Sequence, residues 1–286
     1  MPKWYLLSIV ALLLMGTQRF LYKVSAERGC NTVWTTLVFM ATVALLSTVF
    51  FVAGSEVVSD IPYLLLVALV NAGAFLAATV THIEALKRVP ATIVYPLIRL
   101  DIVLVVLFSV SYFHDRLSAW QIMGIIIALL VIVVLAAEAH EQGPSYKDLK
   151  GGFMLMGIAV LSGALAAISS KFAALYTSPL GFMAISYLMA TIFSFLLKTR
   201  RQGDNAGTNR RDAVVIGLVM GIANFLGFYA YLKALACGPL SLIAPITGMH
   251  FTIAIIFSVL IYKERLTPSR ILGIALAILS MVLLRL

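Results

Sequence analysis

Three ionisable residues lie inside long apolar stretches of this chain and are the first candidates for chemistry: Arg99, Asp101 and His250. A charge in the hydrocarbon of a bilayer costs roughly 2.5–3.5 kcal/mol on insertion scales, so each buried charge needs a reason. Asp101 and His250 are candidates for carrying a proton, because a histidine titrates near physiological pH. Together with Arg19 and Lys171, the group has a cationic balance, which favours a ligand that bears a carboxylate or a phosphate.

The spacing of these residues predicts that they share one depth. The apolar stretch around Arg99 and Asp101 begins near Ala91, and the stretch around His250 begins near Leu240. At a rise of about 1.5 Å per residue, all three lie about 12–15 Å inside, near the middle of a bilayer. Residues two apart point about 200° apart on a helix, so Arg99 and Asp101 are poorly placed to pair. We expect at least one of them to face a central cavity; mutual neutralisation is the alternative interpretation.

Other polar residues within apolar stretches are further candidates for binding a substrate. Arg19 and Lys171 lie about five residues from the ends of their stretches, and the alternative is that they snorkel to the headgroups. Asn71 and Asn224 are either substrate contacts or hydrogen bonds between helices. Tyr95 either lines the cavity or belongs to an interfacial belt.

Two prolines and one His/Glu pair complete the set of candidates. Pro96 and Pro245 lie one to two turns inside their stretches, where proline removes a backbone donor and kinks a helix. Carbonyls freed there can bind a ligand or water if they face a cavity, and a packing kink is the alternative. His82 and Glu84 are a possible gate near the end of a third stretch, or they pair with neighbouring basic residues at the interface.

The composition excludes a soluble enzyme, a disordered chain and a secreted disulfide scaffold. Hydrophobic residues make up 62% of the 286 residues and charged residues 12%, against roughly 45–50% and about 25% in soluble domains. A net charge of +9 does not imply a nucleic-acid partner, because basic residues collect in the cytoplasmic loops of membrane proteins. The sequence has no P-loop, no H-E-x-x-H zinc motif and no G-x-S-x-G motif. We therefore expect no enzyme activity, no cofactor and no metal.

The elements that must position the candidate residues are membrane-spanning helices. A membrane-crossing helix needs about 20 apolar residues. We predict an all-α integral membrane protein with ten transmembrane helices, over residues 4–24, 33–54, 62–85, 91–112, 118–138, 152–176, 180–198, 213–236, 240–261 and 269–285. Small residues spaced four apart at Gly124…Ala128 and Gly273…Ala277 predict that the fifth and tenth helices pack on each other or on a second protomer.

The chain repeats itself at an offset of 149 residues. Between 85–137 and 234–286, 16 of 53 aligned pairs are identical without a gap. The matches include two prolines, a Phe-Ser-Val segment, an Arg-Leu pair after an acidic residue, and a glycine. Each half holds five helices, and because five is odd the second half must be inverted. We predict two inverted repeats, over 1–140 and 141–286, that hold a substrate near the midplane between them.

The repeated pattern Ala-Leu…Pro…Pro…(Asp/Glu)-Arg-Leu…Gly, over Ala85–Gly124 and Ala234–Gly273, resembles the EamA-type branch of the drug/metabolite transporter superfamily. Lys23 and Lys171, late in the first helix of each half, also fit. The resemblance covers nearly the whole chain. It does not fix the substrate, because that superfamily carries amino acids, nucleotide sugars, phosphorylated metabolites, amines and drugs. Small multidrug relatives carry an acid in their first helix, where this chain has Arg19 and Lys23, which counts against proton-coupled export of cationic drugs.

The resemblance and the residues together predict a secondary transporter that exports a small polar metabolite by alternating access. An anionic or zwitterionic substrate is favoured, such as an amino acid or an organic or phosphorylated acid, and the proton is the candidate coupling ion. We expect a multi-pass protein of the plasma (inner) membrane, monomeric or homodimeric, whose partners are a small-molecule substrate and lipids. The alternative hypothesis is a lipid flippase or a membrane enzyme that acts on a lipid headgroup.

The distribution of basic residues predicts the orientation. On the side of the N-terminus lie only Lys3, Arg116, Lys233 and Arg285 of the loop and interface residues, whereas the segment 198–212 on the other side alone carries five basic residues. Basic residues in short loops mark the cytoplasmic face, so we expect both termini outside, although the resemblance suggests the opposite. Reporter fusions at the C-terminus test this expectation, and a cytoplasmic readout would overturn it.

Overall fold

The apolar stretches fold into helices because, in lipid, each segment must satisfy its own backbone N–H and C=O groups. The computed structural model describes residues 1–54, 60–86, 88, 94, 97–137, 149–200, 209–263 and 267–286. Within these ranges all regular structure is helical. Six helices are long and apolar enough to cross a membrane, and four shorter described helices are also apolar. The chain is therefore an α-helical membrane protein.

Apart from the start of the fourth stretch, part of which lies outside the described residues, the helices match the outer bounds of the predicted stretches to within three residues. In chain order they are α1 (Lys3–Glu27), α2 (Thr32–Ala53), α3 (Ile61–Leu86), α5 (Leu100–Tyr112), α6 (Ala119–Ala137), α7 (Leu149–Tyr176), α8 (Pro179–Arg200), α9 (Arg210–Cys237), α10 (Leu240–Gly248), α11 (His250–Tyr262) and α12 (Pro268–Arg285).

The ninth stretch counts as one candidate span over Leu240–Tyr262, but it is interrupted within its length. The helix ends at Gly248 and a new one begins at His250, with Met249 as the break. The Met249 N–H bonds to the Ile246 carbonyl at 3.2 Å, three residues back. Pro245 lies inside α10, four residues before the break. Proline alone therefore does not account for this break, since a proline disturbs the turn that precedes it.

The fourth stretch is interrupted in a related way at Arg99, directly before α5. The Ile102 N–H bonds to the Arg99 carbonyl at 3.1 Å, which is again a three-residue spacing. The broken helices also touch, because a Cβ added to Gly248 would lie 2.8 Å from Cδ1 of Ile102. The hydrogen atom of Gly248 is what lets α5 and α10 cross this closely. Pro96 and Tyr95 lie outside the described residues.

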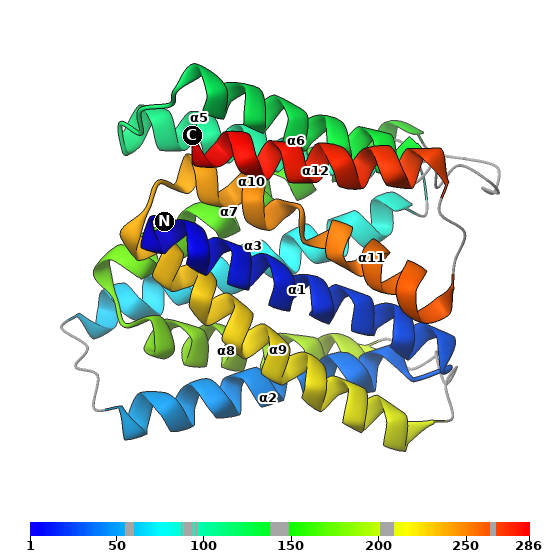
Figure 1. Ribbon diagram of the computed structural model, residues 1–286. Coiled ribbons are helices and arrows are strands. Elements are labelled where there is room, and N and C mark those ends of the chain that lie inside the picture. Colours follow the sequence, from blue (N-terminus) through cyan, green and yellow to red (C-terminus); the bar gives the residue numbers. More distant parts are fainter. Residues whose placement is uncertain are drawn as a thin grey trace.

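The contacts between helices recur when the two halves are exchanged. At the 149-residue offset, α1 corresponds to α7, α3 to α9 and α6 to α12. The main contact of α3 is with α7, and the equivalent contact joins α9 to α1; α6 packs on α12 and α2 on α8. In Figure 1 the two ends of the chain lie on the same side of the molecule. The helix packing therefore relates the two halves by an approximate two-fold exchange.

The predicted contact between the fifth and tenth stretches is confirmed. A Cβ on Gly124 of α6 would lie 3.1 Å from the Leu284 nitrogen of α12. The Ser280 hydroxyl also donates to the Gly124 carbonyl at 2.8 Å. Because Gly124 is near the start of α6 and Leu284 near the end of α12, the two helices run antiparallel. Small residues permit this approach where lipid supplies no hydrophobic drive between helices.

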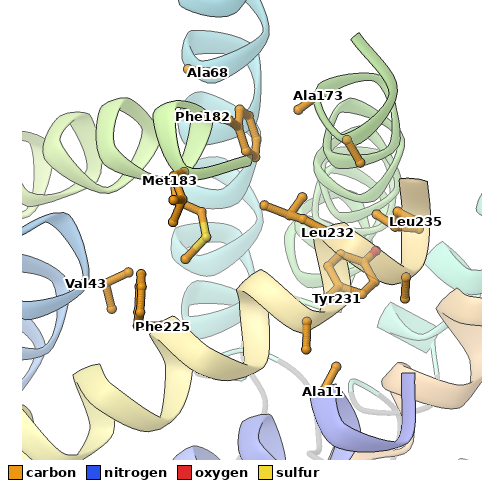
Figure 2. Packing of buried hydrophobic residues seen from close by; sticks show 14 of the residues in the cluster. Ala11, Val43, Ala68, Ala173, Phe182, Met183, Phe225, Tyr231, Leu232 and Leu235 are labelled. Atoms are coloured by element: carbon orange, nitrogen blue, oxygen red, sulfur yellow. The ribbon is translucent and has the colours of Figure 1, made fainter. Parts of the chain in front are cut away.

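The largest buried cluster is centred on α9 and draws on both halves of the chain. Figure 2 shows Tyr231, Leu232 and Leu235 of α9 between helices of the first and the second half. The cluster also contains, among others, Ala11 of α1, Val43 of α2, Ala68 of α3, Ala173 of α7 and Phe182 of α8. Helices of both halves contact α9, α1 and α2 from the first and α7 and α8 from the second, so the halves share one core.

A backbone detail also repeats at the offset of 149 residues. His114 and Lys263 are the two described non-glycine residues with positive φ, at 55° and 51°. Each directly precedes the acidic residue of the repeated (Asp/Glu)-Arg-Leu motif. A left-handed conformation costs a residue with a Cβ roughly 1–2 kcal/mol. Both halves therefore end a helix with the same unfavourable turn, which indicates that the turn geometry is required there.

The left-handed turn predicts opposite effects for two substitutions at the exposed Lys263. Lys263→Gly removes the Cβ and should raise the free energy of unfolding by about 1 kcal/mol relative to Lys263→Ala. Lys263→Val should lower the free energy of unfolding by a similar amount relative to Lys263→Ala, because β-branched residues tolerate the left-handed region worst. Thermal unfolding of the purified variants measures both effects, and Lys263→Ala controls for the lost charge. Equal stability of the glycine and alanine variants would contradict the assignment.

Candidate functional site

The candidate site begins with the backbone groups that the two helix breaks leave without ordinary helical partners. At the first break, Oδ1 of Asp101 accepts a hydrogen bond from the Ile102 N–H at 2.8 Å. At the second break, Nδ1 of His250 lies 2.8 Å from the Thr247 carbonyl oxygen. A carbonyl only accepts, so Nδ1 carries the proton and donates it. The two pseudo-equivalent residues thus bond to backbone groups beside the breaks: Asp101 to an N–H that also bonds to the Arg99 carbonyl, and His250 to a carbonyl.

The second nitrogen of the His250 ring is bonded to an arginine. Nε of Arg19 lies 3.2 Å from Nε2 of His250. Because the arginine only donates, Nε2 must be the acceptor, and the ring is the neutral tautomer with its proton on Nδ1. His250 is buried, whereas Arg19 is exposed. The structure therefore brings together two predicted residues that lie 231 positions apart.

A glycine sets the close approach that makes this bond. A Cβ on Gly16 would lie 2.5 Å from Cβ of Ile253 and 2.7 Å from the His250 carbonyl oxygen. Gly16 and Arg19 are three residues apart on α1 and so lie on one face of the helix. The α1 helix reaches Glu27, three residues past the predicted stretch, which leaves Arg19 about 12 Å from its end. Arg19 is therefore further from the end of its helix than the sequence indicated.

Asp101 packs against α7, and the charge of Arg99 also acts on its carboxyl group. A Cβ on Gly163 of α7 would lie 2.9 Å from Oδ2 of Asp101, so only a glycine fits there without a shift. Within the described ranges, Arg99 and Asp101 form no ion pair with each other. Each helix break therefore packs against the first helix of the opposite half: His250 against α1, and Asp101 against α7.

Positive charge accumulates around the second break. The charges of Arg19 and Arg99 both act on His250, and both also act on His82 of α3. Arg99 is partly buried. His82 was a candidate either for a gate with Glu84 or for pairing with neighbouring basic residues, and in the structure the charges of both arginines act on it. We define the basic cluster as Arg19, His82, Arg99 and His250; it is built from four segments of the chain.

The two predicted asparagines make hydrogen bonds between helices. Nδ2 of Asn71 donates to the Ala166 carbonyl of α7 at 2.8 Å and to the Ser169 hydroxyl at 2.9 Å. Nδ2 of Asn224 donates to Oε1 of Gln18 at 2.8 Å, and its Oδ1 accepts from the Tyr187 hydroxyl at 2.5 Å. Gln18 adjoins Arg19 in the sequence, so the Asn224 network holds the segment of α1 that carries the arginine. Gln18 and Tyr187 were not predicted.

Lys171 is a helix cap in this structure and is remote from the basic cluster. Its buried ammonium donates to the carbonyl oxygens of Leu235 and Gly238, the latter at 2.8 Å. These carbonyls belong to the end of α9, where a cation is favoured by unbonded carbonyls and by the helix dipole. The Phe113 ring lies 5.5 Å from the same ammonium.

Asp115 of the repeated motif also caps a helix, a role that the sequence analysis missed. Its Oδ2 accepts hydrogen bonds from the Ser109 hydroxyl at 2.5 Å and from the Ser241 hydroxyl at 2.6 Å. It also accepts from the Ser241 N–H at 3.2 Å, in the first turn of α10. The sequence did carry a signal for this cap, because a serine precedes the acidic residue of the motif by six positions in both halves. Lys171 and Asp115 thus fix the α9–α10 turn from both sides.

One described cavity is mostly apolar. A cavity of about 280 Å³ lies between α3 and α7, and apolar side chains such as Val67 and Ile168 line most of it. None of the basic cluster lines it. In the part of the chain that the structure describes, no group of three potential metal ligands comes together.

The family match found by comparison with known proteins also divides the chain into two halves. The EamA-like transporter family matches residues 2–137 and 149–286. A Haemophilus influenzae protein described as "Uncharacterized protein" is 26% identical over 182 residues, which are 62% of this chain and 60% of the relative's length. A solved structure described as "Crystal structure of protein" superimposes with a TM-score of 0.82 and 16% identity, over 100% of this chain and 99% of the other. The structural likeness shows the fold alone.

The cap at the α9–α10 turn predicts a cost for Lys171→Met. The variant leaves two carbonyls at the end of α9 without their ammonium donor and should lower the free energy of unfolding by about 1–3 kcal/mol. Lys150→Met, at an exposed position on the same helix, is the matched control and should change it by no more than about 0.5 kcal/mol. Thermal unfolding in detergent measures both. If Lys171→Met and Lys150→Met unfold at the same temperature, the cap contributes nothing to stability.

Proposed function

The chain belongs to the EamA-like transporter family, and from that premise we propose that it is a secondary transporter working by alternating access. The family identity makes it a multi-pass membrane protein with a small-molecule substrate. We propose the plasma (inner) membrane as its location. The protein carries no catalytic role in this proposal, and transport follows from movement of the two halves around a shared site.

In this proposal the chain crosses the membrane ten times, as two inverted five-helix repeats over 1–140 and 141–286. Support comes from the two separate family matches, from the antiparallel contact of α6 with α12, and from helix contacts that recur on exchange of the halves. The left-handed residues His114 and Lys263 add support at single-residue level. An odd number of spans in each repeat then produces the inversion.

One observation carries the proposed substrate site: the bond between Arg19 of the first half and His250 of the second half. A group that is held by both halves is strained or released when the halves move, as alternating access requires. Arg99 and Asp101 lie at the equivalent break in the first half. We place the substrate between these breaks, with Pro96 and Pro245 in the segments that lead into them.

The charge at the breaks favours an anionic or zwitterionic substrate, such as an amino acid or an organic or phosphorylated acid. Arg19 and Arg99 supply two positive charges, and Asp101 supplies one negative charge that faces α7. A substrate carboxylate or phosphate would offset the surplus. Export, as the direction of transport, and the proton, as the coupling ion, belong to the same proposal.

Uptake assays test the assignment of the site. Reconstituted into liposomes and supplied with a panel of small anionic metabolites, the wild type should transport at least one of them. Arg99→Ala and Asp101→Asn should each lower the initial rate at least tenfold, which corresponds to about 1.4 kcal/mol. Arg285→Ala, at an exposed helix end, is the matched control and should transport at the wild-type rate.

Two results would contradict the proposal. Wild-type rates in both the Arg99→Ala and the Asp101→Asn variants would remove the site assignment. Scrambling of labelled phospholipid by the wild type, without uptake of any water-soluble metabolite, would favour a lipid flippase instead. Ligand-dependent thermal stabilisation across the same panel identifies the substrate class independently, because any ligand of the native state raises its apparent stability.

A further inference from the structure

We propose that Arg19 and His250 form a proton-linked anion site, in which a carboxylate or phosphate takes the place of the imidazole on Arg19 and the released imidazole takes up a proton. The proposal rests on the proposed transport function and specifies how substrate and coupling ion share one site. It follows from the hydrogen bonds at the second helix break.

The first step of the argument is that His250 is held as an acceptor. Its Nδ1 proton is committed to the Thr247 carbonyl at 2.8 Å. The remaining ring nitrogen, Nε2, accepts from Nε of Arg19 at 3.2 Å. The imidazole therefore fills, with a neutral lone pair, the place on Arg19 that an anionic oxygen binds more strongly, because hydrogen bonds between ionised groups are roughly twice as strong as neutral ones.

The second step is that an anion can reach Arg19. Arg19 is exposed although its bond partner is buried. A guanidinium has N–H donors in a planar fork that matches a carboxylate or a phosphate, and the donor to His250 is Nε. Gly16 keeps α1 against α11, so an anion entering beside Arg19 also meets Nε2 of His250.

The third step is the charge balance. When the anionic oxygen accepts the Arg19 Nε–H, Nε2 of His250 loses its donor and its lone pair is available. It then takes one proton from the aqueous phase, and the imidazolium donates to the bound anion. One negative and one positive charge enter together, so the net charge of the site does not change. Deprotonation of Nε2 and return of the Arg19 hydrogen bond reverse the sequence on release.

The order of these events follows from electrostatics. Without an anion, an imidazolium at this position would stand beside Arg19, with the Arg99 charge also acting on it. Like charges disfavour the protonated form, and an opposite charge within about 4–6 Å favours it. The described charged groups that act on the ring are these two arginines. An anion between Arg19 and His250 changes the sign of the local interaction, so proton uptake depends on anion binding.

The experiment uses the full chain in lipid nanodiscs with ¹⁵N-labelled histidine. The sequence has four histidines, so the His250 signals can be assigned with a His250→Gln variant. The probes are potassium acetate and potassium phosphate, each compared with potassium chloride at equal ionic strength and constant pH. We expect His250 in chloride to be the neutral ring protonated at Nδ1. Acetate or phosphate should raise its ratio of imidazolium to imidazole at least tenfold.

Two variants separate the anion from the proton. Arg19→Gln should abolish the response of His250 to either probe, whereas Arg285→Gln should leave it unchanged. His250→Gln keeps an oxygen acceptor for Arg19 but cannot be protonated. It should still be stabilised thermally by the probe, but without the uptake of about one proton per bound anion that a weakly buffered wild-type sample shows. If Arg19→Gln does not fold, the His250→Gln variant still tests the proposal.

The proposal is overturned if His250 does not respond at the highest probe concentration, if it is already imidazolium in chloride, or if the response survives Arg19→Gln. Uptake into proteoliposomes distinguishes this failure from failure of the transport function. Metabolite uptake without a His250 response removes only the proton-linked site. A His250 response without uptake of any solute leaves the anion site in place and removes the transport function.

Discussion

Backbone groups that leave a helix inside a membrane must still be hydrogen-bonded, and this constraint organises the centre of the protein. Both interrupted helices meet it with an ionisable side chain at the position after the break or one residue beyond it. Asp101 accepts from the Ile102 N–H, and His250 donates to the Thr247 carbonyl. The backbone bond places a proton on Nδ1 of His250, and the Arg19 donor makes Nε2 the acceptor. The backbone at the break and the contact with α1 together determine which tautomer the ring adopts.

The same breaks connect the two halves. Each packs against the first helix of the opposite half, and in each case a glycine permits the contact: Gly16 beside His250 and Gly163 beside Asp101. The core is shared in the same manner, since residues from both halves surround α9. The site and the core are therefore properties of the pair of repeats. Neither half alone contains the complete site or the complete core.

Much of the architecture could be predicted from the sequence, because its causes are local or periodic. The lengths of the apolar stretches predicted where the helices lie. The 149-residue offset predicted the repeat and made Asp101 and His250 equivalent positions in it. Contacts between distant helices were beyond such arguments. Nothing in the sequence places α1 against α11, so the bond of Arg19 to His250 could not be derived. Lys171 was a candidate for substrate binding or for snorkelling, whereas its ammonium binds carbonyls whose position depends on how α7 meets the end of α9.

The crossing of α5 and α10 joins the two halves at two levels. Toward the α9–α10 turn, the Ser241 N–H of α10 donates to the Ser109 hydroxyl of α5 at 3.2 Å. At the other end of α10, Gly248 meets the tip of Ile102, where an added Cβ would lie 2.8 Å from Cδ1. The two broken helices are thus joined by a polar contact at one level and by close packing at the other, so a shift of either helix must be accommodated by its counterpart in the opposite half.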